Sequence, residues 1–128
     1  LSFFYVFYYI DTINFSIQEH NYHMCNIDLH LCCRDYKFMN SISDKIFTSG
    51  FWSFTLEEAN KFIGCDIYFH NKLSEPSYRG GQIIGIELRK YKDKERILFK
   101  IIEKNENVGK PWYGDISIRQ WYSIKHTK

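Results

Sequence analysis

Four segments of this chain alternate between apolar and polar residues, which is the pattern of a β-strand with one buried face. They cover residues 26–33, 66–70, 82–91 and 96–103. The polar stretch 92–95 separates the last two and predicts a hairpin. A further strand is expected over 115–124, with Ile116 and Ile118 directed inward. The chain is therefore expected to be rich in strands, and its ordinary share of apolar and charged residues excludes wholesale disorder.

The alternation also assigns side chains to the two faces of each strand. The face expected to cover the core contains Ile27, Leu29, Leu31, Cys33, Ile67, Phe69, Ile84, Ile86 and Leu88. The opposite face of the first two strands contains polar side chains, namely Asp28, His30, Cys32, Tyr68 and His70. Gly85, inside the third strand, predicts a bulge or the close approach of another backbone or a ligand.

Two short helices are expected between the first two strands. Apolar residues four positions apart predict a helix over 36–47 with one stripe facing the core. Thr55 and Glu58 form a capping box at the start of the second helix, and Gly64 suits its C-terminal end. The order strand, helix, helix and four strands predicts an α+β fold. We expect a small mixed or antiparallel β-barrel with two short helices near the N-terminal half.

The beginning of the chain differs from the rest. The run LSFFYVFYYI is uncharged, is too short to cross a bilayer as a helix, and lacks the features of a signal peptide. We expect residues 1–23 to be a non-essential apolar N-terminal extension and residues 24–128 to be a single domain. A buried strand and a membrane-proximal segment are the alternatives for the extension. Without a secretory signal, the four cysteines are expected to be reduced, in a cytoplasmic protein with no membrane partner.

Charge is distributed unevenly along the chain. Residues 1–33 contain no Lys or Arg and have a net charge of −3, whereas residues 34–128 contain 17 basic and 12 acidic residues, a net charge of +5. This excess suits an anionic partner such as nucleic acid, although a solvated surface without such a partner has the same composition.

No pattern in the sequence identifies a metal site or a catalytic motif. Six His and Cys residues lie between His20 and Cys33, but their spacing matches no zinc module, so we expect no metal and no cofactor. Phosphate-binding glycine loops and a nucleophile elbow are absent. His70 is the one candidate for general acid–base chemistry, and a histidine at a strand end is more commonly a structural hydrogen-bonding residue. A binding protein is therefore favoured over an enzyme.

The connection between the second and third strands is the most informative segment. GCDIYFH (64–70) leads through SEPSYRGG (74–81) to QIIGIE (82–87). Pro76 and the two glycines predict a tight connection that holds Tyr78 and Arg79. A tyrosine ring stacks on a base and a guanidinium binds phosphate, while a rigid hairpin with an exposed tyrosine is the structural alternative.

These residues resemble the central hairpin of the PUA-like superfamily, especially its EVE, ASCH and YTH branches. The preceding SGFWSF (49–54) is similar to the segment in which YTH domains carry a ligand-binding tryptophan. The resemblance covers roughly residues 26–124 in the order of their elements. It departs from EVE domains, whose Trp-x-Gly-Val-Arg-Asn-Tyr signature this chain lacks. The resemblance implies a small barrel that binds RNA, or a modified base, in an aromatic pocket.

Carried over to this chain, the resemblance makes Trp52 a wall of the pocket and places residues of the two long loops at its mouth. The candidate ligand-binding residues are Trp52, Tyr68, His70, Ser77, Tyr78, Arg79, Lys110 and Trp112. The expected partner is RNA or DNA. One alternative is a small hydrolase-type enzyme on the same scaffold with His70 as general acid or base. Another is a protein–protein interaction module in which the N-terminal segment adds a strand to a partner.

Overall fold

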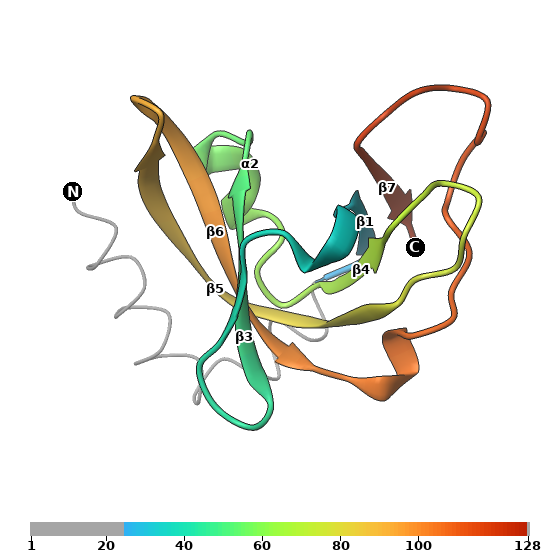
Figure 1. The fold of residues 1–128 in the computed structure, drawn as a ribbon, viewed down its shortest axis with the longest axis horizontal. Helices are drawn as coiled ribbons and strands as arrows, with labels where there is room; N and C mark the ends of the chain where they lie inside the picture. Colours follow the sequence, from blue (N-terminus) through green and yellow to red (C-terminus); the bar gives the residue numbers. More distant parts are fainter. Residues whose placement is uncertain (1–24, 128) are drawn as a thin grey trace.

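Seven strands and one α-helix make up residues 25–127, the part of the chain that the computed structural model describes (Figure 1). The strands are β1 (Ile27–Cys32), β2 (Met39–Ser41), β3 (Ile46–Trp52), β4 (Asp66–His70), β5 (Arg79–Tyr91), β6 (Lys94–Glu103) and β7 (Tyr122–His126). The α-helix is α2 (Leu56–Asn60), and two single 3₁₀ turns are η1 (Arg34–Tyr36) and η2 (Asn105–Asn107). The expected β-rich architecture with few helices is confirmed.

All seven strands belong to one mixed sheet in the order β2-β3-β6-β5-β4-β1-β7. β1 pairs with β4 in parallel, and every other neighbouring pair is antiparallel. The long β5–β6 hairpin crosses the molecule in Figure 1, and β4, β1 and β7 continue the sheet at one end. The loop 71–78 and the segment 104–121 both lie at this end, where they frame the site described below.

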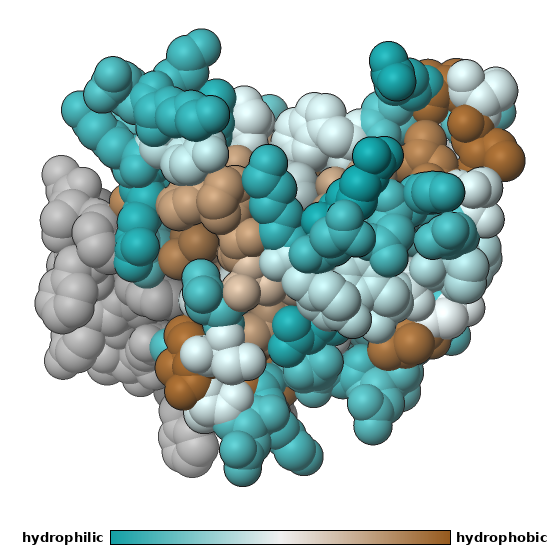
Figure 2. Space-filling model, in the orientation of Figure 1, coloured by the Kyte–Doolittle hydropathy of each residue, from teal (hydrophilic) through white to brown (hydrophobic). Residues whose placement is uncertain are grey.

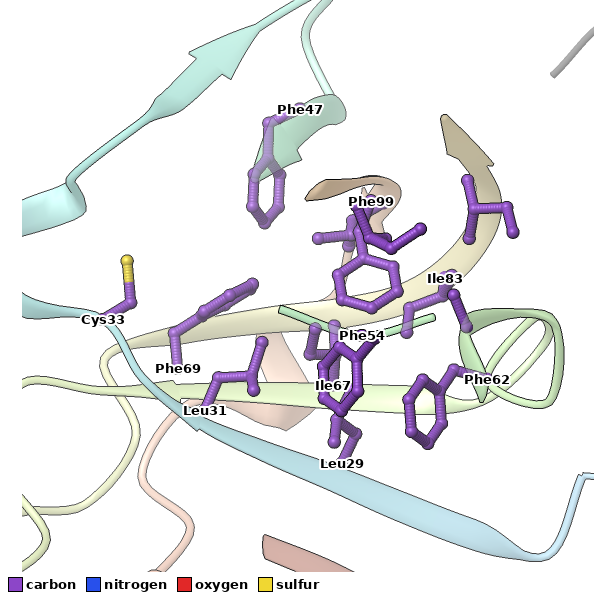
Figure 3. Close-up of a cluster of buried hydrophobic side chains, with 14 residues drawn as sticks. Leu29, Leu31, Cys33, Phe47, Phe54, Phe62, Ile67, Phe69, Ile83 and Phe99 are labelled. Atoms are coloured by element: carbon purple, nitrogen blue, oxygen red, sulfur yellow. The ribbon is translucent and has the colours of Figure 1, made fainter. Parts of the chain in front are cut away.

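The core lies on one face of the sheet, and Phe54 and Phe62, which lie just before and just after α2, belong to it (Figure 3). Leu29 and Leu31 of β1 and Ile67 and Phe69 of β4 are fully buried, as their alternation predicts. Burying one such side chain contributes about 1.5–3 kcal/mol to stability, so these apolar residues determine which face of each strand is directed at the core.

The bulge predicted at Gly85 is present, and it changes which isoleucines reach the core. The register between β5 and β6 shifts between Ile83 and Gly85. As a result Ile83 and Ile86 are both fully buried in the core cluster, and Ile84 is not part of it. The expectation that Ile84, Ile86 and Leu88 share one face is wrong for Ile84, because the extra residue of a bulge reverses the alternation.

Helix α2 begins with the predicted capping box. The Glu58 amide donates to the Thr55 hydroxyl over 3.1 Å, and the Thr55 amide donates to the Glu58 carboxylate over 2.8 Å. The helix is shorter than expected, but Gly64 ends this segment with a positive φ of 89°, which a residue without Cβ adopts at little cost.

The helix expected over 36–47 is wrong. This segment contains the turn after η1, strand β2 and the start of β3, and β2 pairs with β3 from Met39 opposite Ser49 to Ser41 opposite Phe47. The apolar spacing fits a helix equally well, but cross-strand pairing outweighs a weak local preference.

The strand expected over 115–124 is also largely wrong, since β7 covers only Tyr122–His126. Its partner β1 ends at Cys32, whose amide donates to the Trp121 carbonyl over 2.9 Å, so none of the described strands pairs with residues 115–120. Ile116 and Ile118 are 58% and 55% exposed rather than inward. Figure 2 shows hydrophobic surface at the upper right, over the segment that leads to β7 in Figure 1.

Two expectations concern the start of the chain. Cys25 and Cys65 form a disulfide with a Cα–Cα distance of 5.4 Å, so the expectation of four reduced thiols is wrong for this pair. Cys32 and Cys33 are free. The predicted extension 1–23 and its alternatives lie outside the described residues.

Candidate functional site

The candidate site lies on the face of the sheet opposite the core, where the parallel pairing of β1 and β4 gathers polar side chains. His30 stands opposite Tyr68 in the register, and Ser123 of β7 stands opposite His30 on its other side. The neighbouring row places Lys125 opposite Asp28. Paired residues direct their side chains to the same face, so three strands contribute to one polar surface.

Two buried histidines form the centre of this surface. His30 is 4% exposed and His70 is fully buried, and their rings are joined by a 2.9 Å contact between His30 Nδ1 and His70 Nε2. His70 Nδ1 lies 2.9 Å from the backbone carbonyl of Glu75, in the loop 71–78. A carbonyl can only accept, so His70 Nδ1 donates to it, and the neutral His70 ring accepts at Nε2 from His30 Nδ1.

Burial keeps both rings neutral. The pKa of His30 is lowered to about 4 because burial disfavours the charged ring, and nearby His70 and Lys125 add to the effect. Burial also lowers the pKa of His70, against a smaller opposing effect of the Glu75 carbonyl. At neutral pH the pair is therefore a chain of hydrogen bonds between uncharged rings that leaves His30 Nε2 as a free acceptor.

Tyr68 and Asp28 lie beside His30 and complete the wall that the sheet gives to the site. The Tyr68 ring stacks on His30 with centroids 4.6 Å apart and an interplanar angle of 15°. Burial, together with Asp28 and Asp66, raises the pKa of Tyr68, so its hydroxyl remains protonated and can donate. Burial and Asp66 also raise the pKa of Asp28, while Lys125 and Lys104 act in the opposite direction.

Trp112 covers the two histidines from the segment between β6 and β7. It is 7% exposed, and its ring meets His70 edge-on with centroids 5.1 Å apart and His30 with centroids 6.0 Å apart. Two buried polar atoms near the site, Trp112 Nε1 and Ser123 Oγ, have no hydrogen-bond partner among residues 25–127. Unpaired buried groups of this kind are uncommon and call for a functional explanation.

Polar residues anchor the segment that carries Trp112, which is the cover of the site, to the loop 71–78. The Ser77 hydroxyl donates to the Asn107 carbonyl over 2.6 Å and accepts from the Lys110 amide over 3.0 Å. The Asn107 side-chain amide donates to the carbonyls of Ile67 and Gly81 over 3.1 and 3.0 Å. These bonds hold the segment that carries Lys110 and Trp112 in a defined position above β4.

Between the cover and the sheet is a pocket of about 150 Å³, the His30 pocket. It is lined by Asp28, His30, Tyr68, Lys110, Pro111, Trp112, Tyr113 and Lys125. A cavity of about this volume holds one benzene ring, so the pocket has room for one flat ring of a ligand. Three aromatic side chains surround the space, and two lysines supply positive charge at its edge.

A larger pocket of about 380 Å³ lies near α2 and β7, with an apolar wall that includes Phe54, Phe62 and Ile124. Its lining includes Cys25, which directly follows the residues that the structure does not describe. It contains no pair of titratable groups in contact, whereas the His30 pocket combines a histidine pair, a carboxylate and two lysines. Convergent titratable groups with shifted pKa values favour the His30 pocket as the functional site.

The structure brings together some of the residues expected from sequence. Tyr68, Lys110 and Trp112 line the pocket, His70 lies behind His30, and Ser77 anchors the cover. The remaining three lie elsewhere.

Those three have structural partners of their own. Trp52 stacks on Trp121 with centroids 5.7 Å apart, and its Nε1 donates to Ser49 Oγ over 3.0 Å. The Tyr78 hydroxyl donates to the Cys33 carbonyl over 2.6 Å. Arg79 forms two hydrogen bonds with the Glu103 carboxylate and lies 3.7 Å from the centre of the Phe47 ring.

Five pocket residues were not among the sequence candidates: Asp28, His30, Pro111, Tyr113 and Lys125. The alternation places Asp28 and His30 on the polar face of their strand, and this is the sequence signal that points to them. The sequence contains no indication that β1 pairs with β4, and that pairing is what brings His30 to His70.

Within residues 25–127, no three His, Cys, Asp or Glu side chains are grouped in a way that could hold a metal ion. The helices of this described part include none that is long and apolar enough to cross a membrane. Comparisons with protein-family models, with curated proteins and with solved structures give no match.

Proposed function

We propose that this chain is a nucleic-acid-binding module that holds one base of a single-stranded RNA or DNA in the His30 pocket. The observation that carries the proposal is the pocket itself: a space for one ring, walled by Tyr68, Trp112 and Tyr113, with Lys110 and Lys125 at its edge. Bases stack on aromatic rings whatever their identity, and lysines neutralise the flanking phosphates.

The size of the pocket supports a single base rather than a longer segment in the interior. The basic charge of residues 34–128 supports an anionic partner outside the pocket. Lys125 lies 6.0 Å from the centre of the Tyr113 ring, so a positive charge already adjoins an aromatic surface that is 46% exposed. A base inserted beside Tyr113 would leave its phosphate close to this ammonium group.

Membership of the PUA-like superfamily and closure of the sheet into a small barrel form part of the same proposal. The mixed sheet and the bulge in β5 support it, since bulges bend strands and barrels need bent strands. An experimental structure tests it directly: hydrogen bonds between the outer strands β2 and β7, or through an added strand, would establish closure. A sheet with two open edges would refute it.

An enzyme that uses His70 is the less supported alternative. Both ring nitrogens of His70 are already occupied, one by the Glu75 carbonyl and one by His30, so no ring nitrogen is free for a substrate.

The cytoplasmic location expected from sequence also remains a proposal, and the Cys25–Cys65 disulfide is more typical of oxidising compartments.

Binding is tested by fluorescence anisotropy with labelled short single-stranded RNA and DNA of mixed sequence. Trp112→Phe is compared with Trp52→Phe, because both remove an indole and only the first lies in the pocket. We expect Trp112→Phe to weaken binding and Trp52→Phe to leave it unchanged. No binding of either nucleic acid at low salt would refute the proposal.

Salt dependence tests the role of the two lysines. If both contact phosphate, the slope of log affinity against log salt includes about −1.4 from this pair, and Lys110→Ala or Lys125→Ala each reduces it by about 0.7. Lys92→Ala, in the distant β5–β6 turn, is the matched control. Equal slopes in all variants would place the phosphates elsewhere.

A further inference from the structure

The hydrogen-bond polarity of the histidine pair determines what the pocket can recognise. The Glu75 carbonyl requires a proton on His70 Nδ1, and His70 Nε2 then requires a proton on His30 Nδ1. His30 Nε2 is therefore an acceptor, and no donor of residues 25–127 pairs with it. His30 is 4% exposed and lines the pocket, so a donor for this nitrogen has to come from the ligand.

A second acceptor lies beside the first. Asp28 is two residues from His30 on the same face of β1, and its carboxylate lines the same pocket. It forms no ion pair within 4 Å with any residue that the structure describes; Lys104, one of the lysines that lower its pKa, is paired with Asp66 at 2.9 Å. One wall of the pocket thus presents a carboxylate and a ring nitrogen that both lack a donor.

Two neighbouring acceptors select a ring whose edge carries two neighbouring N–H donors. Among the common bases, guanine alone has this edge, formed by its N1–H and its 2-amino group. Adenine and cytosine combine one donor group with a ring acceptor, and uracil places its single N–H between two carbonyls. A carboxylate facing a ring acceptor or a carbonyl would be left unpaired, which penalises these three bases.

We propose that the His30 pocket selects guanine: the six-membered ring fills the space for one ring with its N–H edge directed at Asp28 and His30, and the five-membered ring stays at the mouth with the phosphate directed at Lys110 and Lys125. This inference rests on the proposed nucleic-acid function and adds the identity of the base. His70 is a positioning residue here, because it orients His30 and keeps its Nε2 unprotonated without reaching the ligand.

Titration calorimetry with mononucleotides tests the selectivity. GMP is expected to bind about 5- to 150-fold more tightly than AMP or UMP, since a bidentate contact with a base discriminates by about 1–3 kcal/mol. IMP keeps N1–H but lacks the 2-amino group, so its affinity should lie between those of GMP and AMP. Oligouridine with one central G, A or C then distinguishes a guanine within a strand from a free nucleotide.

Asp28→Asn replaces one acceptor oxygen by a donor at nearly constant size and should abolish the preference for GMP over IMP. Asp44→Asn, in the exposed turn before β3, is the matched control and should keep it. If Asp28→Asn unfolds, as judged by its thermal melt, His30→Gln provides the second test and should reduce the preference for GMP over AMP.

The outcomes separate the two proposals. If neither nucleotides nor oligonucleotides bind, the nucleic-acid function fails and the guanine inference fails with it. If oligonucleotides bind but G, A, C and U are equivalent, only the guanine inference fails. A guanine preference that survives both Asp28→Asn and His30→Gln would also overturn it, because the acceptors would then lie elsewhere.

Discussion

Acidification should destabilise this protein through its two buried histidines, and above all through His30. In the folded chain its pKa is about 4, against 6.5 for an unperturbed histidine. Between these two values the unfolded chain binds more protons than the folded chain, so the free energy of unfolding falls as the pH is lowered. Above about pH 6.5 both states are neutral at this position, and the stability it confers is fully present.

The magnitude follows from the two pKa values. Each pH unit between them is worth about 1.4 kcal/mol, so the loss from His30 alone reaches about 3 kcal/mol by pH 4. Solvent screens little of this effect, because the side chain is 4% exposed and stacked between Tyr68 and the edge of Trp112. For a domain with a total stability of about 5–15 kcal/mol, this is a large fraction.

Urea unfolding followed by tryptophan fluorescence measures the effect at several values between about pH 7 and pH 4. The wild type is compared with His30→Gln, which cannot titrate, and with His126→Gln, an exposed position at the end of β7. Carboxylates that titrate in the same range contribute equally to all three proteins. We expect the stability difference between wild type and His30→Gln to shrink by about 3 kcal/mol on acidification.

Two results would contradict this reasoning. Parallel pH profiles for wild type and His30→Gln would mean that His30 titrates normally and is not held neutral by its surroundings. Loss of the pH dependence in His126→Gln would show that His126, and not His30, causes it.

Three further predictions concern the parts that hold the site together. Asn107→Ala removes the side-chain amide that donates to the carbonyls of Ile67 and Gly81 and should cost about 1–3 kcal/mol in urea unfolding, with faster hydrogen exchange across residues 104–114; unchanged exchange would show that Asn107 does not anchor the cover. Gly81→Ala should prevent folding, judged by circular dichroism, because the new Cβ would overlap the Ile102 carbonyl oxygen of β6, and a wild-type melt would refute the strand contact. Cys65→Ser opens a disulfide that spans 40 residues and should cost about 4 kcal/mol, and a thiol assay of the unfolded, unreduced wild type should count two free cysteines rather than four.

Local patterns predicted the parts of the fold that depend on neighbouring residues. The alternation at 26–33 and 66–70 became β1 and β4 with the expected apolar faces, and the capping box at Thr55 and Glu58 formed as predicted. The failures lie where pairing decides. Residues 36–47 have helical spacing but pair as strands, and residues 115–120 have strand-like alternation but pair with none of the described strands.

The candidate site divides in the same way. Tyr68, Lys110 and Trp112 were named from sequence and line the pocket, whereas Trp52 and Arg79 are held by Trp121 and Glu103. Arg79 shows why residue type alone misleads: a guanidinium suited to phosphate is equally suited to a carboxylate that the fold places beside it.

By itself the sequence determined which side of each strand is apolar, because alternation has a period of two residues and needs no information about partners. Only the tertiary structure decided that β1 lies parallel to β4. That single pairing places His30, 40 residues from His70 in the chain, within hydrogen-bonding distance of it and beneath Trp112. The pairing of distant strands depends on the packing of the whole sheet, and no local pattern encodes it.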